Sequence, residues 1–222
     1  MFVSPETERP EKQITLVLGG AQSGKSYHAQ QLASAFERVT FIATARRTDR
    51  EMRRKIARHR RARPASWKTV EAPVDLDKAI GSQSQKADVL LIDCLTIYAD
   101  NIAGTKKKRK SHANDCIEEI CEAIRASEAS VIVVSNEVGS GIVPEYPSGR
   151  LYRDFLGQMN QKIAQIADRV ILMVAGVPIT IKDSATYNAR VDTSDARPQT
   201  EGVTTSGNGV LKSHFRSQET LK

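Results

Sequence analysis

The segment LVLGGAQSGKSYHAQQLA, residues 16–33, constrains the fold of this chain more than any other stretch of its sequence. It contains the pattern G-x-x-x-x-G-K-S from Gly19 to Ser26, directly after an apolar run. Helical spacing follows the loop, at Tyr27, Gln31 and Ala35. A buried strand, a glycine loop and a helix in this order form the setting in which such a loop holds phosphate. The sequence therefore predicts a nucleotide-binding domain.

The residue types in this loop suit a magnesium-bound polyphosphate. Glycines let the backbone curl around the anion so that successive N–H groups face it, and the helix N-terminus adds its dipole. Lys25 is the expected catalytic cation on the terminal phosphate, and the Ser26 hydroxyl is an expected magnesium ligand. We expect nucleotide contacts from the whole loop: Gly19, Gly20, Ala21, Gln22, Ser23, Gly24, Lys25 and Ser26.

Asp93 is the second expected magnesium ligand. It ends the apolar run VLLID, and an acid at the end of a neighbouring strand commonly positions the ion or its water in phosphate-loop proteins. A helix-capping role is the alternative for Asp93. Glu137 also follows an apolar run and enters a glycine-containing loop, where it contacts ligand or braces the turn.

The remaining pattern predicts an α/β fold. Continuous apolar runs alternate with segments of helical period, which indicates a mainly parallel sheet with helices on both faces and ligands at the carboxyl ends of the strands. The expected strands are 14–18, 39–43, 88–93, 130–135 and 169–174, and the expected helices include 113–127 and 150–167, the latter with a stripe of Leu151, Phe155, Met159, Ile163 and Ile166.

Composition sets the expected domain organisation and compartment. Residues 1–13 are a polar extension, 14–182 the folded domain, and 183–222 a stretch rich in Ser, Thr, Gly and Asp that we expect to be disordered. No apolar run is long enough to span a bilayer, and the polar start resembles no targeting peptide, so we expect a cytoplasmic protein. The three cysteines lack the paired spacing of a zinc site and are expected to be reduced, mostly core thiols.

The net charge of +7 comes from two short segments of the chain. Residues 46–63 contain ten Lys/Arg and two acids, and KKKRK at 106–110 adds five more, so the rest of the chain has 18 basic and 24 acidic residues. We expect 104–113 to be a solvated loop. The cluster at 46–63 is the part that bears on function, because it suits either a nucleoside triphosphate or nucleic-acid phosphates.

His59 is the informative residue of that cluster. On a helix through 50–60 it shares a face with Met52 and Ile56, which by periodicity alone makes it a core histidine. The surrounding arginines favour another role. An imidazole that attacks an α-phosphorus needs cations to take the charge of the departing pyrophosphate, and arginine supplies them with bidentate geometry.

The chain resembles the bifunctional adenosylcobinamide kinase and adenosylcobinamide-phosphate guanylyltransferase family of cobalamin biosynthesis. The resemblance runs from about Ile14 to Lys182. It is carried by LVLGGAQSGKS, FIATA, EMRRKIARHRRARPASWKTVEAP, LLIDCLT with Asn101, SNEVGSGIVP and GRLYRDFLGQMNQKIAQIADRVILMVAGVPITIK. The combination of the phosphate loop with R-P-x-x-W-x-T-x-E and N-E-V-G-x-G-I-V-P makes the resemblance specific.

The resemblance implies a RecA-like phosphate-loop domain, assembled as a homotrimer, with two activities. The first phosphorylates adenosylcobinamide with a nucleoside triphosphate such as ATP or GTP. The second transfers GMP from GTP through a guanylylated histidine, which matches His59, and releases pyrophosphate. Besides the phosphate loop, the implied nucleotide contacts are Ala43, Thr44, Ala45, Arg60, Arg61, Ala62, Arg63, Glu71 and Asp93.

Two alternatives stay open at this stage. One is a kinase that lacks the transferase step, a hypothesis prompted by Arg58, which stands where the family often has a second histidine beside His59. The other is a nucleic-acid-associated ATPase that uses the arginine cluster. Aromatics make up only 5% of the chain and none lies within 46–63, so stacking platforms for bases are missing there and we expect no nucleic-acid partner.

Overall fold

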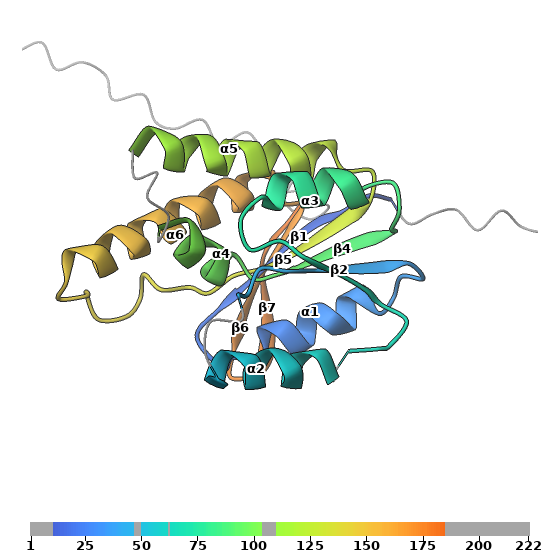
Figure 1. The fold of residues 1–222 in the computed structure, drawn as a ribbon, viewed down its shortest axis with the longest axis horizontal. Helices are drawn as coiled ribbons and strands as arrows, with labels where there is room; N and C mark the ends of the chain where they lie inside the picture. Colours follow the sequence, from blue (N-terminus) through green and yellow to red (C-terminus); the bar gives the residue numbers. More distant parts are fainter. Residues whose placement is uncertain (1–10, 47–49, 62, 104–109, 185–222) are drawn as a thin grey trace, which may run out of the picture.

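A seven-stranded sheet with helices on both faces forms the protein (Figure 1). The computed structural model describes residues 11–46, 50–61, 63–103 and 110–184. The strands are β1 (Ile14–Gly19), β2 (Val39–Ala43), β3 (Lys68–Glu71), β4 (Val89–Asp93), β5 (Ser130–Val134), β6 (Arg169–Val174) and β7 (Val177–Asp183). All five expected strands are present, which confirms the predicted α/β class.

The strand order is β3-β2-β4-β5-β1-β6-β7, and only β7 runs antiparallel to its neighbour. Because β1 to β6 run in one direction, their carboxyl ends share one edge of the sheet. The register places Ala43 of β2 opposite both Glu71 of β3 and Asp93 of β4, while Gly19 of β1 lies opposite Met173 of β6. The fold thus gathers several expected site residues at that edge.

Two helices lie on one face of the sheet and four on the other (Figure 1). The first pair is α1 (Lys25–Ala33) and α2 (Arg50–Arg61). The second group is α3 (Leu76–Gln83), α4 (Leu95–Ala103), α5 (Lys110–Ala126) and α6 (Pro147–Ile166). None of the helices within the described residues is both long and apolar enough to cross a membrane.

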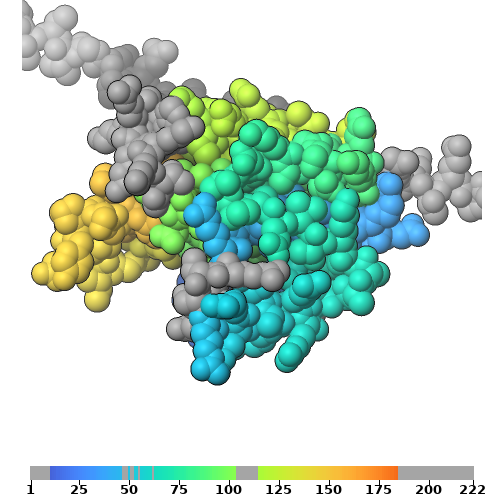
Figure 2. All heavy atoms as spheres, viewed as in Figure 1, coloured from blue at the N-terminus to red at the C-terminus, as the bar shows by residue number. Residues whose placement is uncertain are grey.

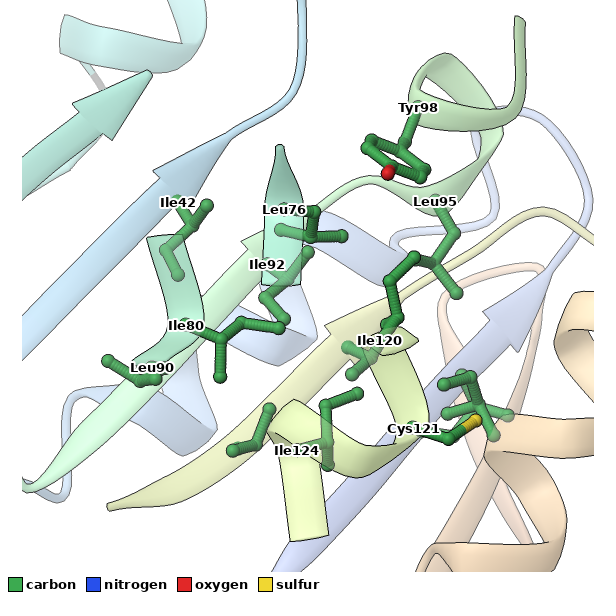
Figure 3. Packing of buried hydrophobic residues seen from close by; sticks show 14 of the residues in the cluster. Ile42, Leu76, Ile80, Leu90, Ile92, Leu95, Tyr98, Ile120, Cys121 and Ile124 are labelled. Atoms are coloured by element: carbon green, nitrogen blue, oxygen red, sulfur yellow. The ribbon is translucent and has the colours of Figure 1, made fainter. Parts of the chain in front are cut away.

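Alternation along the strands divides the core into two layers, since successive side chains of a strand face opposite sides of the sheet. Along β4, Leu90 and Ile92 pack with α3, α4 and α5, whereas Val89 and Leu91 belong to the cluster that includes Ala29 of α1. Figure 3 shows the first layer, where Leu76 and Ile80 of α3 pack against Ile92 of β4. Ile120 and Ile124 of α5 lie beside them.

The helix expected after the phosphate loop is present as α1, and its buried positions are Lys25, Ala29 and Ala33. Two other expectations about the helices were wrong. In α6 the predicted stripe begins too early: Leu151 is 62% exposed, and Leu156 is buried instead. Residues 110–113 are helical, since α5 begins at Lys110, and a lysine run does not oppose a helix. Residues 104–109 of that predicted loop lie outside the described residues.

The cysteine prediction is confirmed in part. All three cysteines are free, Cys121 is buried, and Cys94 and Cys116 are partly buried. Burial raises the pKa of the Cys94 thiol, and the neighbouring Asp93 carboxylate raises it further, which keeps this thiol protonated and unreactive. No group of metal-binding side chains that includes three or more His, Cys, Asp or Glu occurs in the described part of the chain.

Candidate nucleotide site

The loop between β1 and α1 has the backbone that a phosphate cradle needs. Gly24 precedes the first helical residue with φ 93°, and no side chain caps the N-terminus of α1. A Cβ atom on Gly19 would lie 2.5 Å from the carbonyl oxygen of Met173, so only glycine fits there. The first turn of α1 carries no acidic residue. Its N–H groups and dipole therefore face the loop without a competing negative charge.

Contacts within the chain hold this loop in place. Lys25 is 8% exposed, and its Nζ donates to the carbonyl oxygen of Gly20 at 2.5 Å. The turn between β6 and β7 touches the loop from outside, since the N–H of Gly176 donates to the carbonyl oxygen of Ser23 at 3.1 Å. The Ser23 hydroxyl is buried and has no hydrogen-bond partner within the protein. The loop thus presents a lysine and a spare hydroxyl inside a braced backbone.

Asp93 is the point on which several functional side chains converge. Burial raises the pKa of the Asp93 carboxyl, while a hydrogen bond from the Ser26 hydroxyl and the neighbouring His59, Arg63 and Lys25 side chains oppose that rise. These groups come from the phosphate loop, α1, α2 and the segment after α2. The structure therefore brings together the expected magnesium ligands, the expected catalytic lysine and the expected nucleophile.

His59 is not a core histidine. It is partly buried, it belongs to neither hydrophobic cluster of the described residues, and it lies close enough to Asp93 to act on its charge. Ile56 of the same helix face is also partly buried. The core interpretation of the helical spacing is therefore wrong, because α2 lies at the surface and its inward face meets the edge of the sheet rather than the interior.

Arg63 connects the end of α2 to the sheet. Its guanidinium stacks on the Phe41 ring, 3.6 Å from the centroid, and its Nε donates to the carbonyl oxygen of His59 at 3.1 Å. Its Nη1 is buried without a hydrogen-bond partner in the protein. Burial lowers the pKa of Arg63 and Arg60 lowers it further, while Asp93 opposes both. The guanidinium thus keeps a donor available beside the aspartate.

Thr44 connects the carboxyl ends of β2 and β4. Its buried hydroxyl donates to the carbonyl oxygen of Cys94 at 2.8 Å and accepts from the N–H of Cys94 at 2.9 Å. Its N–H donates to the carbonyl oxygen of Asp93 at 3.4 Å, and its carbonyl accepts from the Nδ2 of Asn101 at 2.8 Å. Because its polar groups are engaged internally, Thr44 fixes the backbone on both sides of Asp93.

The remaining expected nucleotide contacts are less enclosed. Ala43 and Ala45 flank Thr44 and are partly buried, and Glu71 ends β3 beside Ala43 with an exposed side chain. The side chains of Arg60 and Arg61 are exposed. Ala62 lies outside the described residues.

Glu137 braces a turn, which was one of its two interpretations. Its carboxylate accepts hydrogen bonds from the N–H groups of Gly139 at 2.6 Å and Ser140 at 3.2 Å. Partial burial opposes ionisation, but these bonds prevail and lower the pKa of Glu137. Its own N–H donates to the carbonyl oxygen of Gly19 at 3.0 Å. The loop after β5 is therefore attached directly to the start of the phosphate loop.

Sequence reasoning missed some of the supporting residues. Phe41 reads as an ordinary buried residue in the run VTFIA, although its ring also carries Arg63. Asn136 is held by Thr96, whose Oγ1 accepts from its N–H at 2.9 Å, and by Asn160, whose Nδ2 donates to its carbonyl at 3.0 Å. Polar residues of α6 lie within an apolar stripe, and this pattern was the sequence signal available for the contact made by Asn160.

The family comparison agrees with this geometry. The family model described as "cobinamide kinase / cobinamide phosphate guanyltransferase" matches residues 15–181. This chain belongs to that family. The match spans every strand and helix that contributes a residue to the site.

Named relatives cover most of the chain. The bifunctional adenosylcobalamin biosynthesis protein CobU of Escherichia coli strain K12 is 38% identical, over 76% of this chain and 99% of the relative. The corresponding protein CobP of Pseudomonas aeruginosa is 39% identical, over 75% of this chain and 96% of the relative. A solved ATPase of a type III secretion system from pathogenic bacteria aligns with a TM-score of 0.46 at 13% identity, covering 72% of this chain and 51% of that one.

Proposed function

We propose that this member of the cobinamide kinase / guanylyltransferase family performs both reactions of its family name, in the cytoplasm. The observation that carries the proposal is the convergence of Lys25, Ser26, His59 and Arg63 on Asp93. A kinase alone has no need of a histidine beside the phosphate loop. The buried Lys25 beside the same aspartate is the cation that transfer of a terminal phosphoryl group requires.

The first reaction is phosphoryl transfer. The hydroxyl of adenosylcobinamide attacks the γ-phosphorus of ATP or GTP, the bond to the bridging oxygen breaks, and the nucleoside diphosphate leaves. Lys25 and the N–H groups at the start of α1 offset the negative charge that develops on the phosphate oxygens. The hydrogen bond from the N–H of Gly176 and the close packing around Gly19 keep these donors in position before the nucleotide binds.

The second reaction is guanylyl transfer. An imidazole nitrogen of His59 attacks the α-phosphorus of GTP, and the bond to the β-phosphate breaks, so pyrophosphate leaves. A phosphate oxygen of the phosphorylated acceptor then attacks the same phosphorus and frees the imidazole. Arg63 keeps one buried N–H donor without a protein partner, and the exposed Arg60 and Arg61 precede it at the end of α2. These cations suit the departing pyrophosphate.

The residues around Asp93 fit a magnesium ion. Mg²⁺ prefers oxygen ligands and is usually held by one or two carboxylates with substrate phosphates and water. The Ser26 hydroxyl and the Asp93 carboxylate already lie within hydrogen-bond distance of each other. An ion held there would supply positive charge that offsets the phosphate charge. We propose these two residues as its protein ligands.

We further propose a homotrimer. The strand β7 and the end of β6 expose four apolar side chains, Val174, Val177, Ile179 and Ile181, each at least 45% accessible. Apolar surface of this kind at a sheet edge favours association with another chain. Light scattering coupled to size exclusion measures the mass, and a monomer at micromolar concentration would contradict the proposal.

The decisive experiment incubates the protein with GTP labelled at the α-phosphate. We expect acid-labile, base-stable protein label, as a phosphohistidine-type bond gives, and its loss in His59→Ala. Arg58→Ala is the matched control, since Arg58 is the exposed neighbour of His59 and should retain most of the label.

Phosphorylation of adenosylcobinamide is measured in the same preparations. We expect His59→Ala to keep this activity. Absence of label in the wild type with phosphorylation intact would leave a kinase only. Absence of both, with nucleic-acid-stimulated hydrolysis, would favour the ATPase alternative.

A further inference from the structure

The loop between β5 and α6 exposes large apolar side chains. Ile142 is 97% exposed, Tyr146 71% and Val143 59%. In Figure 2 the gold atoms at the left, which the colour bar assigns to the segment around residue 150, project from the body of the molecule. Three neighbouring apolar groups in water are unfavourable unless they serve to contact something.

This loop is held rigid while its apolar groups stay exposed. Glu137 bonds the N–H groups of Gly139 and Ser140 at the start of the loop. Arg150 closes the other end, since its Nη1 donates to the carbonyl oxygens of Pro144 at 3.0 Å and Glu145 at 2.6 Å. A loop that collapsed onto the protein would hide its apolar side chains. These braces instead preorganise the exposed surface, which reduces the entropy cost of binding.

The loop is also continuous with the phosphate site. The N–H of Glu137 donates to the carbonyl oxygen of Gly19, the first residue of the phosphate loop. Ile142 is five residues further along the chain. At ~3.5 Å per extended residue, it lies within about 18 Å of that contact. A small acceptor molecule could not touch both places, but a large macrocycle with a flexible arm can.

Resting on the proposed function, we propose that Ile142, Val143 and Tyr146 form the docking surface for the corrinoid ring of the acceptor. The ring lies against the apolar loop while its hydroxyl-bearing arm reaches the phosphate loop. Tyr146 supplies an aromatic body for the flat macrocycle. The same surface serves both reactions, because the ring is unchanged between them.

The test compares the affinity for adenosylcobinamide in equilibrium dialysis, with the visible absorbance of the corrinoid as readout. The variant Ile142→Ser/Val143→Ser should raise the dissociation constant at least about tenfold, as expected for losing burial of two aliphatic side chains. His59 labelling from GTP should stay unchanged, because that half-reaction needs no corrinoid. Unaltered thermal unfolding is expected, since both side chains are exposed.

Leu151→Ser is the matched control, because it makes a similar change at a leucine that is 62% exposed on α6 and has no assigned role. We expect it to leave the corrinoid dissociation constant within twofold. Wild-type affinity in the loop variant would overturn the inference. So would a change in oligomeric mass of that variant, since the loop would then lie between copies of the chain. A wild-type protein that neither labels at His59 nor binds adenosylcobinamide would instead refute the proposed function.

Discussion

The phosphate loop and helix α2 meet at the same aspartate but are built differently. The loop is set between two parallel strands and a helix that packs on the sheet, and Lys25 and Ser23 are almost fully buried. In α2, every residue whose exposure is described is exposed except Ile56 and His59. The first region owes its geometry to the hydrophobic core. The second depends on a few contacts at its end.

Because of this difference, we expect the two proposed reactions to respond differently to mutations in the two regions. Damage to the phosphate loop affects the nucleotide in both reactions, because both use the same polyphosphate cradle. Damage to the attachment of α2 affects the position of His59, and with it only guanylyl transfer. The arginines of α2 do not stabilise the helix by packing, although those in its last turn interact favourably with the helix dipole.

The largest effect is expected from Lys25→Ala. Removing the buried ammonium should lower phosphorylation of adenosylcobinamide at least about hundredfold, as for other preorganised charge donors, and should lower His59 labelling as well. Steady-state kinetics and the labelling assay measure the two activities. Lys86→Ala, at an exposed lysine, is the control. Loss of only one activity would contradict a shared cradle.

An intermediate effect is expected from Arg63→Leu. This change removes the stacking on Phe41 and the bond to the carbonyl of His59, so the end of α2 loses its attachment. We expect His59 labelling to fall about tenfold or more, the scale expected for a displaced catalytic group. Phosphorylation should fall much less. The ratio of the two rates is the measurement, and an equal fall in both would show that Arg63 acts on the nucleotide rather than on α2.

The smallest effect is a gain in stability from Asp93→Asn. Burial raises the pKa of Asp93, so the folded state binds the proton more tightly than the unfolded state does. Such a group contributes stability below its unfolded pKa, and that contribution is lost as pH rises through the folded pKa. At pH 8, without magnesium or nucleotide, Asp93→Asn should therefore unfold at a higher temperature than the wild type.

The gain should shrink as the pH falls below about 3, under the ordinary pKa of an aspartate, where the wild-type carboxyl is protonated in both states. Calorimetry over this range measures it. A variant that is less stable than the wild type at pH 8 would show that the positive charges of Lys25 and Arg63 outweigh the burial. Both activities should be lost in either case, because the proposed magnesium ligand is gone.

The sequence was sufficient for the parts of the fold that follow from strong local patterns. The five expected strands are mainly apolar, and the phosphate loop combines glycines with a lysine and a serine. The strand β3 was missed because KTVE is short, polar and exposed at the edge of the sheet. The strand β7 was missed because its alternating apolar residues face outward, where a buried face was the expected signal.

The site was less predictable than the fold because its supporting contacts are tertiary. Periodicity placed His59 on a helix but assigned its inward face to the core, whereas the helix lies at the edge of the sheet. Nothing in the run VTFIA itself indicates that the guanidinium of Arg63 stacks on the ring of Phe41. The role of Thr44 as a link between two strands likewise depends on the position of Cys94, 50 residues away.

The hydrogen bond from Gly176 to Ser23 has a mechanical consequence. The turn that contains Gly176 joins β6 to β7, and β7 exposes its apolar face at the edge of the sheet. A displacement of this hairpin is therefore transmitted directly to the phosphate loop through that hydrogen bond. In the proposed trimer, a neighbouring chain packed on β7 would therefore also restrict the movement of the phosphate loop.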